Sequence, residues 1–88
     1  MLSDKANPEK NLIREIEGFE SLRKLEYLAL NNNKIKEVKN LEFLTKLRVL
    51  NLGGNLIETL DENELPEGLQ SLTLKDNPFK NVREQILT

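Results

Sequence analysis

The chain has 88 residues, which is enough for one domain, and 38% apolar with 32% charged residues is an ordinary composition for a folded protein. Its 13 basic and 15 acidic residues give a net charge of −2, which argues against nucleic-acid or membrane-surface binding. The absence of Cys and His excludes disulfides, thiolate metal sites and imidazole bases. No apolar run reaches membrane-spanning length, and the start does not resemble a signal peptide. We therefore expect a cytoplasmic, non-enzymatic chain without a cofactor.

Residues 1–10 (MLSDKANPEK) are expected to form a degenerate N-terminal cap on a single domain that spans residues 1–88. The 22-residue period of the following segment puts Ser3, Ala6 and Pro8 at positions where later units carry leucine. Because Pro8 has no N–H to donate to a β-ladder, any strand in this region should be poorly formed.

Residues 11–80 repeat with a period of 22. The segments LEYLALNNNKI, LRVLNLGGNLI and LQSLTLKDNPF align without a gap, and all three share the pattern L-x-x-L-x-L-x-x-N. The connecting segments are apolar at every third position, as in Ile35, Val38, Leu41, Leu44 and Leu47. A repeat of this regularity predicts a stack of similar structural units.

Each unit is predicted to contain a short strand, a turn at the Asn and a return segment. The last two leucines of the pattern lie two residues apart, so both point to one side of a strand. A spacing of three in the return fits a 3₁₀-like segment with one buried stripe. Since one unit cannot bury its own leucines, the strands should stack into a parallel sheet with the returns as an outer wall.

These motifs resemble the leucine-rich repeat family over about residues 11–82, and the 22-residue length is similar to the short SDS22-like subclass of phosphatase-regulatory and axonemal proteins. The resemblance implies an α/β solenoid, a right-handed β-α superhelix with 3₁₀ or irregular returns on its convex side and about three and a half repeats. It also implies that the concave face of the sheet binds a protein partner.

The third return, IETLDENELPEGL, departs from the pattern. Asn63 stands where the two earlier returns have Phe19 and Leu41, and Leu65 and Pro66 shift the apolar spacing. We expect a locally different outer wall, a solvated bend at residues 61–64, and a turn at Gly68 that leads into the last strand.

Residues 81–88 are predicted to begin a C-terminal cap helix, with Asn81 as its N-cap and Val82 and Ile86 facing the last repeat. Members of the resembled subclass continue into a further closing segment, whereas this sequence stops at Thr88. The hypothesis is that the chain is a fragment or packs against a partner at its C-terminal end.

Candidate partner-binding residues follow from strand alternation, because residues between and beside the inward leucines should face out of the sheet. Tyr27 and Arg48 lead this set, since interface hot spots favour Tyr and Arg. The other candidates are Glu26, Asn31, Val49, Asn51, Thr73 and Lys75. Two stripes across the sheet are predicted, Tyr27–Val49–Ser71 and Ala29–Asn51–Thr73. If these residues bind nothing, the alternative contact is Phe43 on the outer wall.

The three asparagines at residues 31–33 are predicted to have two different roles. Asn33 matches Asn11, Asn55 and Asn77, so its side chain is expected to turn inward and bond backbone groups. Asn31 and Asn32 have no such counterparts, and they are interpreted as free to vary and free to bind.

The favoured function is a protein–protein interaction module, a scaffold or adaptor in a larger assembly such as a ciliary or flagellar complex. A regulatory subunit resembling phosphatase regulators and a bare repeat scaffold without a partner remain alternatives. The sequence contains neither a Gly-rich phosphate loop nor a nucleophile with a base partner, so no motif in it indicates an enzyme.

Overall fold

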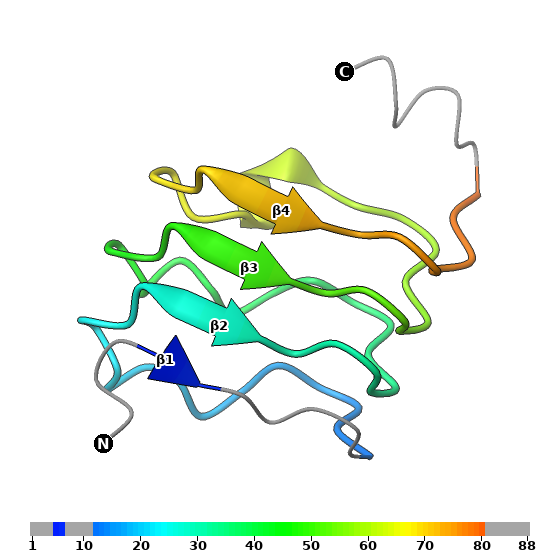
Figure 1. Cartoon of the computed structure of the whole chain (residues 1–88), viewed down its shortest axis with the longest axis horizontal. Helices are drawn as coiled ribbons and strands as arrows, with labels where there is room; N and C mark the ends of the chain where they lie inside the picture. The colour runs from blue at the N-terminus through cyan, green and yellow to red at the C-terminus, as the bar shows by residue number, and fades with distance from the viewer. Residues whose placement is uncertain (1–4, 7–11, 81–88) are drawn as a thin grey trace.

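A computed structural model of the chain describes residues 5–6 and 12–80. Four short strands form one parallel sheet in the order β1 (Lys5–Ala6), β2 (Tyr27–Ala29), β3 (Val49–Asn51) and β4 (Ser71–Thr73). The strands point the same way and the connecting returns pass behind the sheet (Figure 1). The cap helix expected over residues 81–88 lies outside the described residues, as do Ser3, Pro8 and Asn11.

The register of the sheet follows the 22-residue period. Leu28 lies beside Leu50, and Leu50 lies beside Leu72. At the N-terminal edge Ala6 lies beside Leu28, which is the partner that the period assigns to it. Backbone hydrogen bonds continue beyond the strands, since Leu30 N–H donates to Asn51 O at 2.8 Å and Asn32 N–H donates to Gly53 O at 2.9 Å. The predicted parallel stacking is confirmed.

The core lies between the sheet and the returns, and it is built from the repeating leucine and isoleucine positions. Side chains of the central turns are fully buried: Ile16, Leu25, Leu28, Leu30, Ile35, Leu41, Leu44, Leu47, Leu50, Leu52 and Ile57. The corresponding positions at the two ends of the described stack are only partly buried, as at Ile13, Phe19, Leu72 and Leu74. An inner turn is covered from both sides, which explains this gradient.

The first two returns, residues 13–25 and 35–47, have the same local structure. Gly18 (φ 85°) and Asn40 (φ 61°), at the same repeat position, both take the left-handed conformation. After Asn40, Leu44 N–H donates to Leu41 O at 3.0 Å and Leu47 N–H to Leu44 O at 3.1 Å. These bonds link residues three apart, so the predicted 3₁₀-like return is confirmed.

The third return differs, as the sequence predicts. It contains the one 3₁₀ helix among the described residues, Glu62–Glu64, in place of the left-handed residue. Asp61 begins this helix, because its side-chain oxygen accepts the N–H of Asn63 at 2.9 Å. Asn63 is exposed, and the buried Pro66 lies at the repeat position of Leu44. A turn from Pro66 to Leu69 then leads into β4.

No helix within residues 5–6 and 12–80 has the length and apolarity needed to cross a bilayer.

Candidate functional site

The strand face is the outward surface of β2, β3 and β4, and it is defined here by six positions in two rows. One row is Tyr27, Val49 and Ser71, and the other is Ala29, Asn51 and Thr73. The pairing register places the members of each row side by side, so both predicted stripes exist. The leucines between them point into the core because side chains alternate along a strand.

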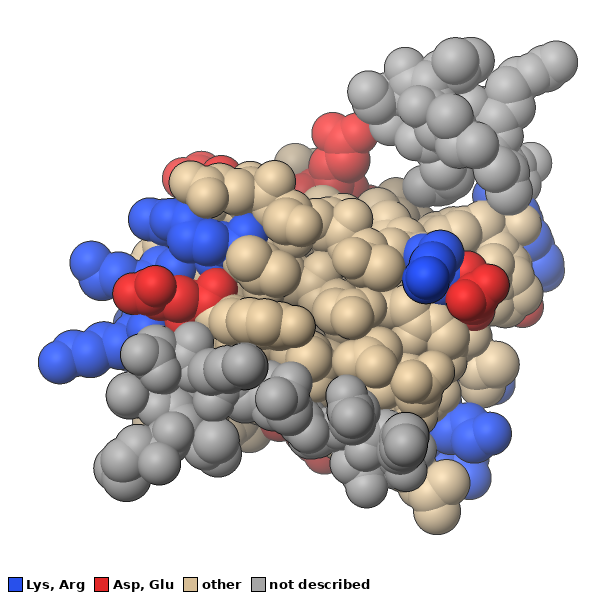
Figure 2. All heavy atoms as spheres, viewed as in Figure 1, with Lys and Arg blue, Asp and Glu red and all other residues tan. Residues whose placement is uncertain are grey.

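The strand face has no charged residue, while charged side chains gather near the two ends of the strands (Figure 2). Tyr27 and Val49 are half-buried, Ala29 is 2% exposed and Ser71 is exposed. An uncharged centre with a polar and charged rim is the usual composition of a protein–protein interface.

Asn51 and Gly53 continue the strand face toward the turn. The side-chain oxygen of Asn51 accepts the N–H of Gly53 at 3.0 Å, which fixes the amide against the backbone. A Cβ at residue 53 would lie 3.3 Å from that oxygen and 3.4 Å from the carbonyl oxygen of Lys75. Gly53 therefore allows close approach of neighbouring turns. Lys75, at the same repeat position, is exposed.

Asn31 and Asn32 differ in how strongly the backbone constrains them. Asn32 (φ 64°), Gly54 (φ 69°) and Asp76 (φ 61°) share one repeat position and one left-handed conformation. Asn, Gly and Asp are the residues that tolerate this conformation best, so the interpretation of Asn32 as free to vary is wrong. Asn31 is half-buried at the end of β2, and its carbonyl accepts from the Asn33 amide at 3.3 Å.

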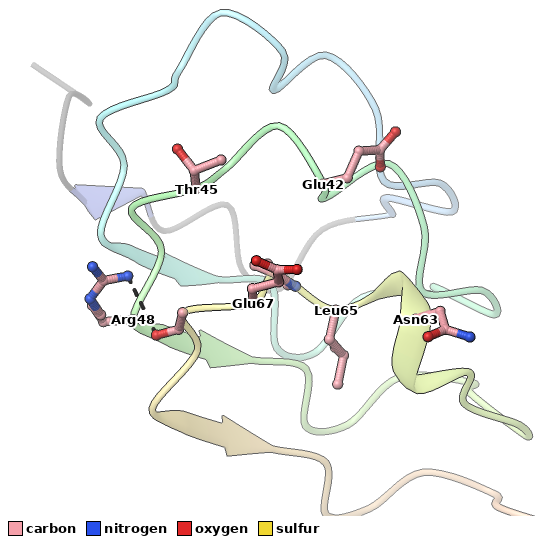
Figure 3. Close-up of a pocket in the computed structure, with 8 residues that line it drawn as sticks. Glu42, Thr45, Arg48, Asn63, Leu65 and Glu67 are labelled. Carbon is pink, nitrogen blue, oxygen red and sulfur yellow. Dashed lines mark hydrogen bonds between the residues drawn. The ribbon is translucent and has the colours of Figure 1, made fainter.

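Arg48 lies at the start of β3, and its guanidinium turns away from the strand face toward the next return. Its Nη1 donates to the carbonyl oxygen of Leu47 at 3.2 Å and to that of Gly68 at 3.4 Å. Figure 3 shows the bond to Gly68 and the hollow that these residues share. The hydrogen bonds of the Arg48 side chain thus go to backbone carbonyls of the returns. Glu26, one turn earlier, is exposed at the same edge.

The hollow in Figure 3 lies in the outer wall between the second and third returns and has a volume of about 500 Å³. Glu42 and Thr45 line it from the second return, and Leu65 and Glu67 line it from the third. The hollow lies beside the irregular third return, where the exposed Asn63 stands at the repeat position of the buried Leu41. Sequence reasoning found the irregularity but did not assign any site to it.

Residues 12–80 contain no group of three or more carboxylate side chains placed to hold a metal ion. What the described surface does provide is an uncharged sheet face and hollows along the outer wall and the flank.

Stacked strand–turn–return units with an inward Asn at each of three described turns, Asn33, Asn55 and Asn77, define a repeat protein. A comparison with protein families matches a model for "Leucine Rich repeats (2 copies)" to residues 23–67, about half of the chain. The chain belongs to the leucine-rich repeat family. No curated protein sequence matches it. Leucine-rich repeats are generally protein–protein interaction modules, and they are typically non-enzymatic.

Proposed function

We propose that the chain binds a protein partner through the strand face. The observation that carries this proposal is the uncharged surface of six positions in register across β2, β3 and β4. Tyr27 anchors it, because a half-buried Tyr offers a large, rigid contact area at low entropic cost. Val49 extends the apolar part, and Asn31, Asn51 and Thr73 supply polar contacts beside it.

Glu26, Arg48 and Lys75 form the rim of this proposed site. Glu26 and Arg48 lie at the start of the strands and Lys75 lies after β4. Rim charges act mainly on association rate and orientation, so their removal should slow binding more than it weakens the complex.

The experiment is affinity capture with the tagged full chain, followed by quantitative comparison of variants. Tyr27→Ala with Val49→Ser should abolish capture of any partner that binds the strand face. Glu20→Ala with Glu42→Ala, at equivalent exposed positions of two returns, is the matched control and should retain it. The proposal fails if the strand-face variant keeps the partner while the control, or a Phe43→Ala variant, loses it. Unfolding curves of all variants should show that they remain folded.

We further propose that the partner belongs to a larger intracellular assembly. The 22-residue period supports the SDS22-like subclass, whose members act in ciliary or flagellar complexes and as phosphatase regulators. Right-handed crossovers dominate between parallel strands, which supports a right-handed superhelix for the stack. The half-buried Leu72 and Leu74 at the last described turn support packing of a partner at the C-terminal end. Native co-purification separates these versions: axonemal proteins, a phosphatase, or no stoichiometric partner, which would favour a bare scaffold.

A further inference from the structure

A second surface lies on the flank of the stack, where the chain leaves the Asn turn and enters the return. It is a groove of about 580 Å³ between the starts of the first two returns, near residues 14 and 36. Leu56, just before the third return, lines one side of it. Four basic side chains line it, together with two carboxylates and one leucine. We name it the flank groove, and its residues are Arg14, Glu15, Lys34, Lys36, Glu37, Lys39 and Leu56.

The repeat explains why these cations meet. Arg14 and Lys36 occupy the same repeat position in neighbouring turns. The N–H of Lys34 donates to Ile13 O at 2.8 Å, which holds the two turns side by side. Ile35 is buried between Lys34 and Lys36, so the two lysines both point outward.

The two carboxylates of the groove share one lysine as their ion-pair partner. Lys39 Nζ lies 3.2 Å from Glu15 Oε1 and 3.5 Å from Glu37 Oε1. Hydrogen bonding to Glu15, and then the charges of Glu15 and Glu37, raise the pKa of Lys39 above its ordinary value. Within residues 12–80, Arg14, Lys34 and Lys36 form no ion pair. Four basic against two acidic side chains leave the groove with a net positive charge, in a chain whose net charge is −2.

Leu56 supplies an apolar wall beside these charges. It stands at the repeat position of Lys34 one turn later and is 39% exposed, and Leu12 at the same position one turn before Lys34 is also exposed. Its N–H donates to Ile35 O at 2.8 Å, so its backbone is fixed next to the lysine-bearing turn. The groove therefore combines basic side chains with an apolar edge whose backbone is fixed.

We propose that the flank groove binds an acidic peptide segment of a second protein, in which carboxylates flank an apolar residue. The carboxylates pair with Arg14, Lys34 and Lys36, and the apolar side chain packs on Leu56. Nucleic acid fits less well, because three cations on a chain with an overall negative charge cannot follow a long phosphate backbone. The groove and the strand face are separate surfaces, so one partner that touches both would gain from bivalent binding.

The test is an NMR titration of the labelled full chain with the peptide acetyl-Glu-Glu-Leu-Glu-Glu-amide. The amide signals of Arg14, Lys34, Lys36 and Leu56 should shift, and affinity should fall as salt is added. Lys34→Glu with Lys36→Glu should weaken binding by about tenfold or more, since each exposed ion pair contributes up to ~1 kcal/mol.

The matched control is Lys24→Glu with Lys46→Glu, which makes the same change in net charge at exposed positions near the start of the strands. It should leave affinity within about twofold, because exposed charges more than a Debye length away are largely screened. Equal loss in both variants would overturn the proposal, because the attraction would then be general. Equal binding of inorganic phosphate, or of the peptide with Gly in place of Leu, would also overturn it and reduce the groove to an anion site.

Discussion

The side-chain oxygen of Asn55 accepts the backbone N–H of Ile35, one turn earlier in the stack, at 3.1 Å. The amide nitrogen of Asn55 donates to Leu30 O and Leu52 O, at 3.0 Å each. Asn77 repeats the arrangement, since its oxygen accepts from Ile57 N–H at 3.0 Å. Each Asn thus satisfies backbone groups of its own turn and of the preceding one, and it links neighbouring repeats.

Asn55→Ala should lower the free energy of unfolding by about 3 kcal/mol, because it leaves several backbone groups near a 4% exposed position without partners. Urea denaturation measures this change. Asn55→Asp should recover none of the loss, since a buried carboxylate can accept from Ile35 but places its second oxygen against the carbonyl oxygens of Leu30 and Leu52. Asn63→Ala, at an exposed Asn of the third return, is the control and should change stability by less than ~0.5 kcal/mol. Equal effects at the two positions would contradict the prediction.

The sequence predicts the strand order of the described residues because the repeat determines the register and which side chains face inward. Leu28, Leu50 and Leu72 align as the 22-residue period requires, and Asn33 and Asn55 turn inward. A period cannot show how many neighbours each turn has, so it does not predict that Leu72 is less buried than Leu50. The geometry of the third return likewise depends on how Pro66 and Leu65 fill the space that Asn63 leaves.

The candidate site was less predictable. Strand alternation places Tyr27 and Val49 correctly on one row, but Arg48 precedes β3, where alternation no longer sets the direction of a side chain. Its guanidinium follows the carbonyl oxygens of Leu47 and Gly68 instead. For Asn32 a signal was present, because Asn, Gly and Asp at one repeat position are the three residues that a left-handed turn favours.

Gly54→Ala should destabilise the protein by about 1–2 kcal/mol, because an L side chain at a φ of 69° is strained. The added Cβ would also lie 2.5 Å from the side-chain oxygen of Asn32. In an Asn32→Gly background that collision disappears, so only the backbone part, about 1 kcal/mol, should remain. A double-mutant cycle in urea measures the difference. Strictly additive effects would show that Asn32 and Gly54 do not interact in this way.

Gly68→Ala should destabilise the protein for a different reason. The φ of Gly68 is not positive, so the backbone is not strained, but the new Cβ would collide with the end of the flexible Arg48 side chain. Arg48→Ala removes bonds to two backbone carbonyls and should cost about 1 kcal/mol. In that background Gly68→Ala should become nearly neutral, since the space is then open. Urea unfolding of the two single variants and the double variant tests this, and an undiminished cost of Gly68→Ala would contradict it.

Lys39 gives the stability of the protein a specific dependence on pH. Its pKa in the folded state is raised above 10.5 by Glu15 and then by Glu37. The stabilisation is therefore fully present below the unfolded pKa and is lost as the pH rises through the higher folded pKa. The urea midpoint of wild type should exceed that of Lys39→Met at neutral pH, and the two midpoints should converge as the pH rises through the raised pKa of Lys39. Lys24→Met, at an exposed lysine without an ion pair in residues 12–80, should show no convergence.

Because the Lys39 ion pairs are exposed, ~1 M salt should also reduce the wild-type advantage at neutral pH. A difference independent of both pH and salt would mean that Lys39 acts by packing rather than by charge.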